Sequence, residues 1–509
     1  MDQRGPTFTW LRGSPGTGKS TIAKTITADL WEEKRLASAI YFNKTLAQDN
    51  TFSVPRFICS IAYQITEFSV AFCQALSQRL EEDGGIHPYA DWVGLFEQLL
   101  GKPLRHLPPP LTTRWVVVID GLDECGSRGD LKQLMGALSK CAALPLTFLV
   151  TSRPEFEVVY GMERISTSPC AIEDLDAADR ESTDHDILRY LQFRIKGLPN
   201  RHDPAWPPSK EQCTAFVARC KGLFELAAIL LRQFEDESSG RVLSEEFSEL
   251  VNETYYIASD SNSALHAEYR RILQRAYPQD TSRKGKETML RYQRVVGTLV
   301  LLQQPLGTRA LADLLGISTE QVRAVLRPLS SVVAVPDPDD HPISFYHASF
   351  PEFLLPPSAS QEDSTHSPHH IHVPECETLL AQRCLDIMNS MLVYNICKLS
   401  DLFMRNEEIP DLSENLDTHA PAHLRYTALH WAKHLASSGD PARVSSLLHD
   451  WCQNKMIFYL ELMSLLDRCD AIVPLLNYAI EWAQACPPSM SLVLINALIR
   501  HFTEVHLRC

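Results

Sequence analysis

The sequence lacks several features that would assign it to a protein class at once. In its 509 residues no apolar run approaches the roughly 18–20 residues that a transmembrane helix needs. Residues 1–6 hold no apolar core of a signal peptide. The 14 cysteines are scattered without a recurring spacing or a CxxC pair, so neither a disulfide framework nor a zinc site is indicated. We therefore expect a cytoplasmic protein with reduced thiols and no membrane span.

Basic residues are also in deficit. Lys and Arg number 48 against 63 Asp and Glu, which gives a formal net charge of −15. Nucleic acids and anionic membranes attract basic surfaces, so the composition predicts no nucleic-acid partner. Hydrophobic residues make up 45% and charged residues 22%, as in ordinary globular proteins. The length predicts about two to four domains.

Short β-branched runs alternate with helical stretches through the first 198 residues. The predicted strands are residues 8–11, 37–42, 116–119 and 148–151, and the predicted helices are residues 20–33, 54–68, 131–140 and 182–195. Strands that alternate with helices predict a parallel sheet with right-handed crossovers. The expected fold of this part is therefore α/β, with the sheet between two helical layers.

The rest of the chain has few strand signals. A helical period runs through residues 212–235, after the proline-rich segment 199–208. Three helices (290–302, 308–315 and 319–326) are then followed by two short strands (332–335 and 343–346), which is a winged-helix pattern. We predict a core at 1–198, a helical domain at 209–285, a winged helix at 286–357, a flexible linker at 358–374 and an all-α region at 375–509.

A complete phosphate-loop motif, G-x-x-x-x-G-K-[ST], follows the first predicted strand and precedes the first helix. Its residues are Gly13, Ser14, Pro15, Gly16, Thr17, Gly18, Lys19, Ser20 and Thr21. Glycines let backbone N–H groups approach phosphate oxygens at a helix N-terminus, where the helix dipole favours anions. Lys19 can reach the β- and γ-phosphates, and the Ser20 hydroxyl can bind Mg²⁺. The alternative is a glycine-rich turn with an exposed lysine.

A second motif ends an apolar strand with acids. Residues 115–119 are followed by Asp120, Asp123 and Glu124. In an open α/β sheet the carboxyl ends of the strands form the ligand-binding edge, so Asp120 is the candidate that holds Mg²⁺. Asp123 or Glu124 could polarise an attacking water. The alternative is a strand-end turn with solvated acids.

Arg153 lies two residues past the end of the predicted strand at 148–151. An arginine at this edge of the sheet could sense the γ-phosphate of a bound nucleotide. The alternative is an ion pair between Arg153 and Glu155 or Glu157.

These three segments occur in the order seen in a known family. The phosphate loop, the strand ending in Asp120-Gly121-Leu122-Asp123-Glu124 and the segment Thr151-Ser152-Arg153-Pro154-Glu155 resemble the NACHT branch of the STAND P-loop NTPases. More specifically, the chain is similar to fungal NACHT-containing NOD-like receptors, which are also described as nephrocystin-3-like N-terminal domain proteins. The segments Gly222-Leu223-Phe224, His347-Ala348-Ser349-Phe350 and residues 424–435 extend the resemblance toward the C-terminus.

The resemblance implies an ATP/ADP-binding signalling switch with weak ATPase activity. Lys19, Ser20 and Thr21 would hold phosphate and Mg²⁺, Asp120 the metal, Arg153 the sensor position, and His347 the β-phosphate of ADP. The implied partners are nucleotide, further copies of the chain in the ATP-bound form, and unknown sensor and effector proteins of fungal innate immunity or cell-death-type signalling.

The chain departs from the family in three ways, of which the mildest is that Glu352 replaces the usual Asp. Only about seven residues precede the first strand, where the family has a segment that helps to hold the base, and Phe224 stands where related families have an adenine-contacting proline. No effector domain or repeat array is evident in the sequence, as a truncated gene model would predict.

Two other functions remain open. A non-switching P-loop ATPase or scaffold would use the same motifs. A winged-helix DNA-binding regulator is disfavoured by the sequence, because the helix at 319–326 carries a single arginine, Arg323, followed by Arg327, and because the wing turn at 337–340 is acidic.

Overall fold

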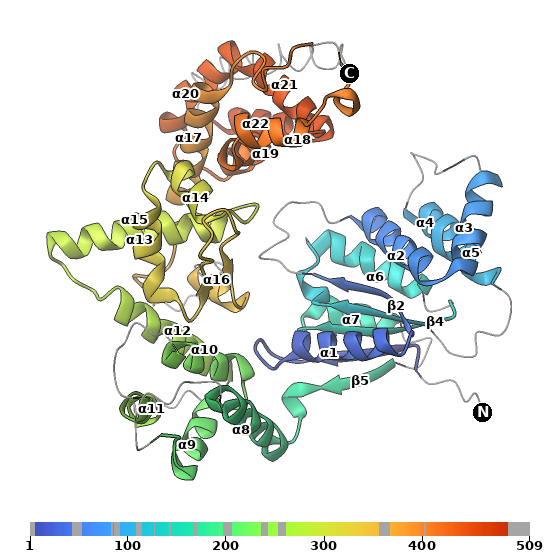
Figure 1. Cartoon of the computed structure of the whole chain (residues 1–509), viewed down its shortest axis with the longest axis vertical. Helices are drawn as coiled ribbons and strands as arrows, with labels where there is room; N and C mark the ends of the chain where they lie inside the picture. Colours follow the sequence, from blue (N-terminus) through green and yellow to red (C-terminus); the bar gives the residue numbers. More distant parts are fainter. Residues whose placement is uncertain are drawn as a thin grey trace. The chain divides into compact units, whose positions relative to one another are not determined.

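The structure is a computed structural model of the whole chain. It describes residues 6–42, 53–82, 85, 92–107, 115–126, 128–141, 144–165, 170–196, 206–235, 243–252, 261–355, 367–401 and 404–486. The chain divides into two compact units (Figure 1). One contains Met1–Glu268 and His347–Ser349, and the other contains Tyr269–Tyr346 and Phe350–Cys509.

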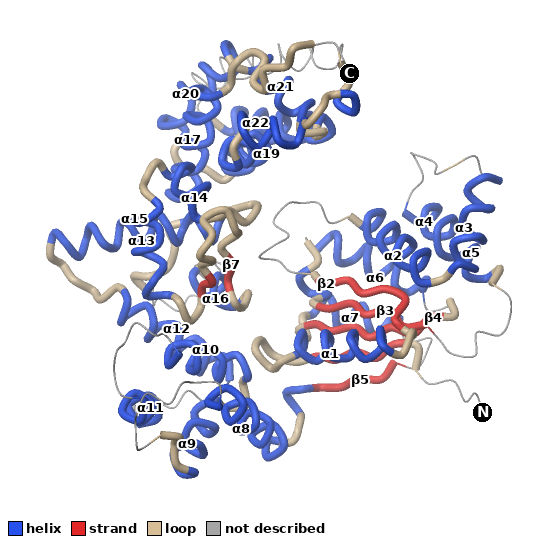
Figure 2. Tube along the Cα trace, in the orientation of Figure 1, coloured by secondary structure: helices blue, strands red, loops and turns tan. Residues whose placement is uncertain are grey.

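A five-stranded parallel sheet forms the centre of the first unit (Figure 2). Its strands are β1 (Phe8–Arg12), β2 (Leu36–Tyr41), β3 (Trp115–Asp120), β4 (Leu146–Ser152) and β5 (Cys170–Asp174). The order across the sheet is β2-β3-β4-β1-β5. The predicted parallel sheet is confirmed, and the sequence missed only β5, an edge strand whose residues are half-buried or exposed.

Helices pack on both faces of the sheet, and the central strand β3 presents apolar side chains to both. In β3, Val116 and Val118 pack with Ala23 and Leu30 of α1 (Lys19–Glu32) on one face. Val117 and Ile119 point to the other face. There they join a core that includes residues of α2 (Val54–Phe68), α6 (Arg128–Cys141) and α7 (Phe156–Ile165). This burial on two sides explains why β3 has no polar residue before Asp120.

Further helices of the first unit lie between the strands or after the last of them in the chain. They are α3 (Val70–Glu82), α4 (Trp92–Phe96), η1 (Glu97–Gly101), α5 (Lys102–Arg105), η2 (Leu122–Glu124), η3 (Leu175–Ala177), α8 (Arg180–Lys196), α9 (Lys210–Cys220), α10 (Phe224–Glu235) and α11 (Leu243–Asn252). The continuous helical period predicted at 212–235 is two helices. Lys221 and Gly222 adopt φ values of 52° and 76°, and this left-handed turn ends α9.

The second unit contains three helices followed by an antiparallel two-stranded ribbon, in the order that the sequence predicts. These elements are α13 (Arg283–Leu301), α14 (Thr308–Leu315), α15 (Thr319–Leu326), β6 (Val333–Ala334) and β7 (Ser344–Phe345), with α12 (Ser261–Ala276) before them and η5 (Arg327–Leu329) between α15 and β6. The limits of α14 and α15 match the prediction. Gly316 ends α14 in the left-handed conformation, and Ser318 begins α15 with a capping box. That these elements form a winged helix stays a prediction.

The remainder is helical. It contains α16 (Ser349–Leu354), α17 (Val373–Met391), η6 (Asn406–Glu408), α18 (Leu412–His419), α19 (Ala422–Ala436), α20 (Pro441–Asn454), α21 (Met456–Leu465), η7 (Cys469–Ala471) and α22 (Ile472–Ala485). Trp431, Trp451 and Tyr459 pack against one another in its core. Of the predicted linker, residues 358–366 lie outside the described residues, whereas His369 and Ile371 are buried. Across the described ranges, no helix combines the length and apolarity that a bilayer crossing needs.

Candidate phosphate-binding site

The loop between β1 and α1 presents backbone N–H groups at a helix N-terminus. Gly16 and Gly18 adopt φ values of 82° and 97°, in the left-handed region that glycine enters at little cost. Gly18 is the N-cap of α1, and among the described residues no side chain caps this helix end. The first N–H groups of an α-helix have no partner within the helix. Here they are available to an anion, as the motif predicts.

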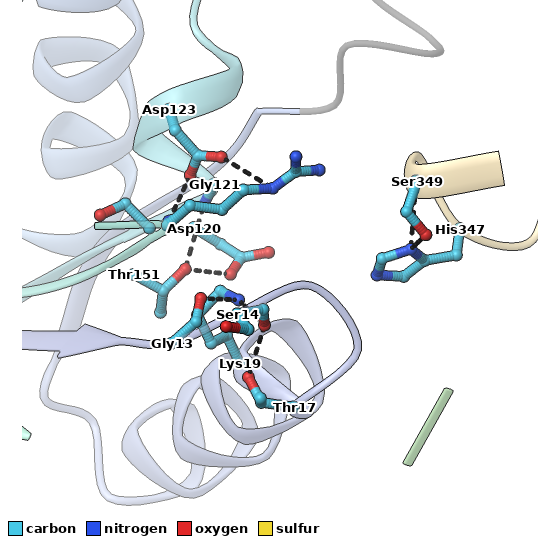
Figure 3. Close-up of polar contacts among 12 residues, drawn as sticks. Gly13, Ser14, Thr17, Lys19, Asp120, Gly121, Asp123, Thr151, His347 and Ser349 are labelled. Carbon is cyan, nitrogen blue, oxygen red and sulfur yellow. Dashed lines mark hydrogen bonds and ion pairs between the residues drawn. The ribbon is translucent and has the colours of Figure 1, made fainter. Parts of the chain in front are cut away.

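Lys19 reaches back across the loop that precedes it. Its Nζ donates hydrogen bonds to the carbonyl oxygens of Gly13, at 2.8 Å, and Ser14, at 2.9 Å (Figure 3). Burial lowers the pKa of the Lys19 ammonium, and the nearby Asp123 carboxylate acts in the opposite direction. The positive charge is therefore fixed at the mouth of the loop rather than free in solvent.

Asp120 ends β3 with its carboxylate almost entirely buried, at 4% exposure. The Thr151 hydroxyl, from β4, donates to Asp120 Oδ1 at 2.5 Å, and the Gly121 N–H donates to Thr151 Oγ1 at 3.0 Å. Asp120 is also one of the carboxylates whose negative charge acts to raise the pKa of the Lys19 ammonium. The structure thus brings the ends of β1, β3 and β4 to one edge of the sheet, as the sequence predicts.

The residues at this edge fit a magnesium–phosphate group. Mg²⁺ in nucleotide sites takes one or two protein oxygens and completes its shell with phosphate and water. Asp120 Oδ2 and the exposed hydroxyl of Ser20 supply such oxygens. In the described part of the chain, no cluster of three or more His, Cys, Asp or Glu side chains could hold a metal without phosphate.

Asp123 and Arg153 form an ion pair next to Asp120. The Arg153 backbone N–H donates to Asp123 Oδ1 at 2.9 Å, and Arg153 Nε lies 3.4 Å from Asp123 Oδ2. The Asp123 side chain is 4% exposed. Both of its oxygens are therefore engaged by Arg153, a partner that the sequence did not indicate. Glu124, in η2, is half-buried.

His347 groups with the unit that contains the sheet. Its Nδ1 accepts the backbone N–H of Ser349 at 3.2 Å and lies 2.6 Å from the Ser349 hydroxyl oxygen (Figure 3). An Nδ1 that accepts from an N–H carries no proton, so the neutral ring carries its proton on Nε2. Burial is the main cause that lowers the pKa of His347, and the positive charges of Arg153, Lys19 and Arg232 act in the same direction, so that the pKa is about 3.

Two elements that contact the loop were not predicted from the sequence. The N–H of Glu225, at the start of α10, donates to the Gly16 carbonyl at 3.2 Å. A Cβ at Gly16 would lie 2.9 Å from the Glu225 Cβ, so this close approach also requires glycine. The second element is η3, whose Asp176 accepts from Ser14. Both contacts join segments far apart in sequence, and no local pattern marks them.

A pH dependence of stability follows from His347. An unfolded histidine has a pKa near 6.5, whereas in the folded protein that of His347 is about 3. Between these values the unfolded chain binds one more proton, so the free energy of unfolding falls as the pH falls from 6.5 toward 3. One proton contributes at most about 1.4 kcal/mol per pH unit. His347→Asn keeps an acceptor for the Ser349 N–H without titrating, so thermal midpoints measured from pH 7 to 4 should fall less steeply in this variant. Equal slopes would contradict the assignment.

Comparison with known proteins gives one family match. Residues 1–153 match the family described as Nephrocystin 3, N-terminal. This match covers the phosphate loop, Asp120, Asp123, Glu124 and Arg153, but less than half of the chain. No curated protein matches the sequence. Together with the sheet and the loop, the match indicates that the N-terminal part has a P-loop NTPase-like fold.

Solved structures align with the chain only loosely. A structure of the Drosophila ORC bound to DNA aligns with 12% sequence identity over 65% of this chain and 78% of the other, with a TM-score of 0.30. A structure of Drosophila ORC bound to AT-rich DNA and Cdc6 aligns with 11% identity over 98% of this chain and 67% of the other, with a TM-score of 0.23. At these TM-scores the alignments assign neither a fold nor a role nor a partner to this chain.

One prediction from the composition needs correction. The acidic balance predicted no nucleic-acid partner, yet the structures that align with the chain are of complexes bound to DNA. Net charge is a sum over the whole molecule, whereas contacts with phosphates depend on local groups of basic side chains. The exclusion of nucleic acid from the partners rested on net charge alone and is withdrawn, and the alignments do not assign a DNA contact to this chain.

Proposed function

We propose that this chain is a nucleotide-binding P-loop NTPase that works as an ATP/ADP-dependent switch with weak ATPase activity. The observation that carries the proposal is the convergence of Lys19 and Asp120 at one edge of the sheet, beside a helix N-terminus without a side-chain cap. The finer assignment, to the NACHT branch of the STAND proteins in fungal cell-death-type signalling, is part of this proposal and rests on the motifs.

Different groups of the site bind the phosphates and the metal. The loop N–H groups and the Lys19 ammonium bind the phosphates, and Ser20 and Asp120 hold Mg²⁺, which neutralises phosphate charge. Since Asp123 is held by Arg153, we assign the orientation of the attacking water to Glu124. We assign the sensor role to Arg153, whose backbone N–H and Nε are both held by the Asp123 carboxylate.

His347 supplies the difference between the two nucleotide states. Its neutral ring presents the Nε2–H as a donor, since Nδ1 is engaged by Ser349. A ligand shifts a conformational equilibrium only by its differential affinity for the two states. A complete switch requires a difference of about 10⁴-fold, and a bond from His347 to the β-phosphate of ADP would provide part of it. Self-association of the ATP-bound form is the proposed output.

To test the proposal, the purified protein is denatured and the nucleotide that it releases is identified and quantified. We expect ADP or ATP in near-stoichiometric amount, and a thermal midpoint that rises when Mg²⁺ and ADP are added and falls when the metal is chelated. Limited proteolysis should give different fragments with ADP and with a non-hydrolysable ATP analogue. Protein that contains no nucleotide and shows no thermal shift with millimolar ADP or ATP would refute the function. Identical fragments with both nucleotides would refute the switch alone.

A further inference from the structure

A short segment after the edge strand β5 holds the first half of the phosphate loop. In η3, Asp176 Oδ2 accepts the backbone N–H of Ser14 at 2.8 Å and the Ser14 hydroxyl at 3.0 Å. The approach is close, because a Cβ at Gly13 would lie 3.1 Å from the Cβ of Leu175.

Asp176 is itself fixed by neighbours. Its backbone N–H donates to Asp174 Oδ1 at 3.0 Å. Asp174, the last residue of β5, forms an ion pair with Arg12 at 2.8 Å. Arg12 and Asp174 are also register partners in the parallel pair of β1 and β5. The pairing of the two strands therefore sets where the Asp176 carboxylate lies.

The bond from Ser14 to Asp176 determines where a carbonyl group points. The N–H of Ser14 and the C=O of Gly13 belong to one peptide group, and in a planar trans peptide they point in opposite directions. Asp176 accepts from the N–H side of this peptide, and Lys19 Nζ donates to its carbonyl side at 2.8 Å. A continuous series of hydrogen bonds therefore links Asp176, the Gly13–Ser14 peptide group and Lys19.

The Ser14 carbonyl completes the arrangement. It accepts the Lys19 ammonium at 2.9 Å and the Thr17 hydroxyl at 2.9 Å. Two of the three Lys19 protons are thereby held by the two carbonyl groups on either side of Ser14. The third remains to be directed at an anion in the loop.

We propose that Asp176 is a positioning residue of the phosphate loop, which orients the Gly13–Ser14 peptide so that its carbonyl holds the Lys19 ammonium in the phosphate-binding position. The phosphate part rests on the proposed function, whereas the orientation of the peptide does not. Asp176 acts through Ser14 and Lys19 and does not itself contact a phosphate.

Three variants test this role. Asp176→Ala removes both hydrogen bonds, and Asp176→Asn keeps an acceptor oxygen without the charge. Glu173→Ala, at an exposed acid on β5, is the matched control for loss of charge. The first readout is hydrogen–deuterium exchange of residues 11–18 in protein without added nucleotide. The second is the dissociation constant for Mg²⁺-ADP, with the thermal midpoint measured to show that each variant is folded.

The expected pattern separates the variants. Asp176→Ala should accelerate exchange at Ser14 and weaken Mg²⁺-ADP binding by on the order of tenfold, since it removes the two hydrogen bonds that hold Ser14. Asp176→Asn should stay near the wild type in both readouts, and Glu173→Ala should match the wild type.

Two results would overturn the assignment. One is an Asp176→Ala protein that matches Glu173→Ala in exchange and affinity. The other is an Asp176→Asn protein that loses as much as Asp176→Ala. If the wild-type protein binds no nucleotide at all, the proposed function fails, while the exchange of the Ser14 amide still tests the role of Asp176.

Discussion

Lys19→Ala is expected to weaken the binding of ADP and ATP by about a hundredfold or more. Removing one partner of a desolvated charge pair costs about 2–5 kcal/mol, and each 1.4 kcal/mol is a factor of ten in affinity. Lys19 meets that description, because burial lowers the pKa of its ammonium and two loop carbonyls fix its position. Binding of a fluorescent nucleotide to the purified variant measures the effect.

The same helix provides the control for this experiment. Lys24 lies in α1 with its side chain exposed, so Lys24→Ala removes one positive charge from the same helix but leaves the loop intact. We expect Lys24→Ala to bind nucleotide within about twofold of the wild type, because exposed charges are screened. If Lys19→Ala bound nucleotide as tightly as Lys24→Ala, the assignment of the phosphate site would be wrong.

Asp120→Asn should lower the rate of ATP hydrolysis by about a hundredfold or more while changing ADP affinity much less. An amide keeps the oxygen that accepts from Thr151 at 2.5 Å, but it removes the negative charge that attracts Mg²⁺. Metal-ion stabilisation of the transition state supplies several kcal/mol in phosphoryl transfer. The lysine and the loop N–H groups remain, and they account for most of the binding.

Two measurements check the role of Asp120. Phosphate release at saturating ATP reports turnover, and the Mg²⁺ concentration that gives half of the maximal thermal shift with ATP reports metal affinity. Asp29→Asn, at an exposed acid in α1, is the control and should match the wild type in both. Wild-type turnover and an unchanged Mg²⁺ requirement in Asp120→Asn would show that Asp120 does not hold the metal.

Elements with a strong local pattern were predictable. The limits of α2, α14 and α15 match their sequence predictions, because an N-cap serine or a C-terminal glycine coincides with the ends of the helical period. The central strand β3 was recognisable as an unbroken apolar run followed by an acid. Prediction failed where a single helical period in the sequence runs through two separate helices. The helical period at 212–235 is α9 and α10, divided at Lys221 and Gly222.

For the candidate site, the sequence by itself determined which residues line the phosphate loop and which acid ends the apolar strand β3. A glycine-rich turn between a strand and a helix, and an apolar strand with a terminal aspartate, are local patterns with one common geometry. Only the tertiary structure decided the partners of these residues. These partners are Arg153 for Asp123, Asp176 for Ser14 and Glu225 for Gly16. The strand order β2-β3-β4-β1-β5 and the packing of α10 bring these residues together. They are separated by 30 to more than 200 positions in the chain, and no local periodicity relates residues so far apart.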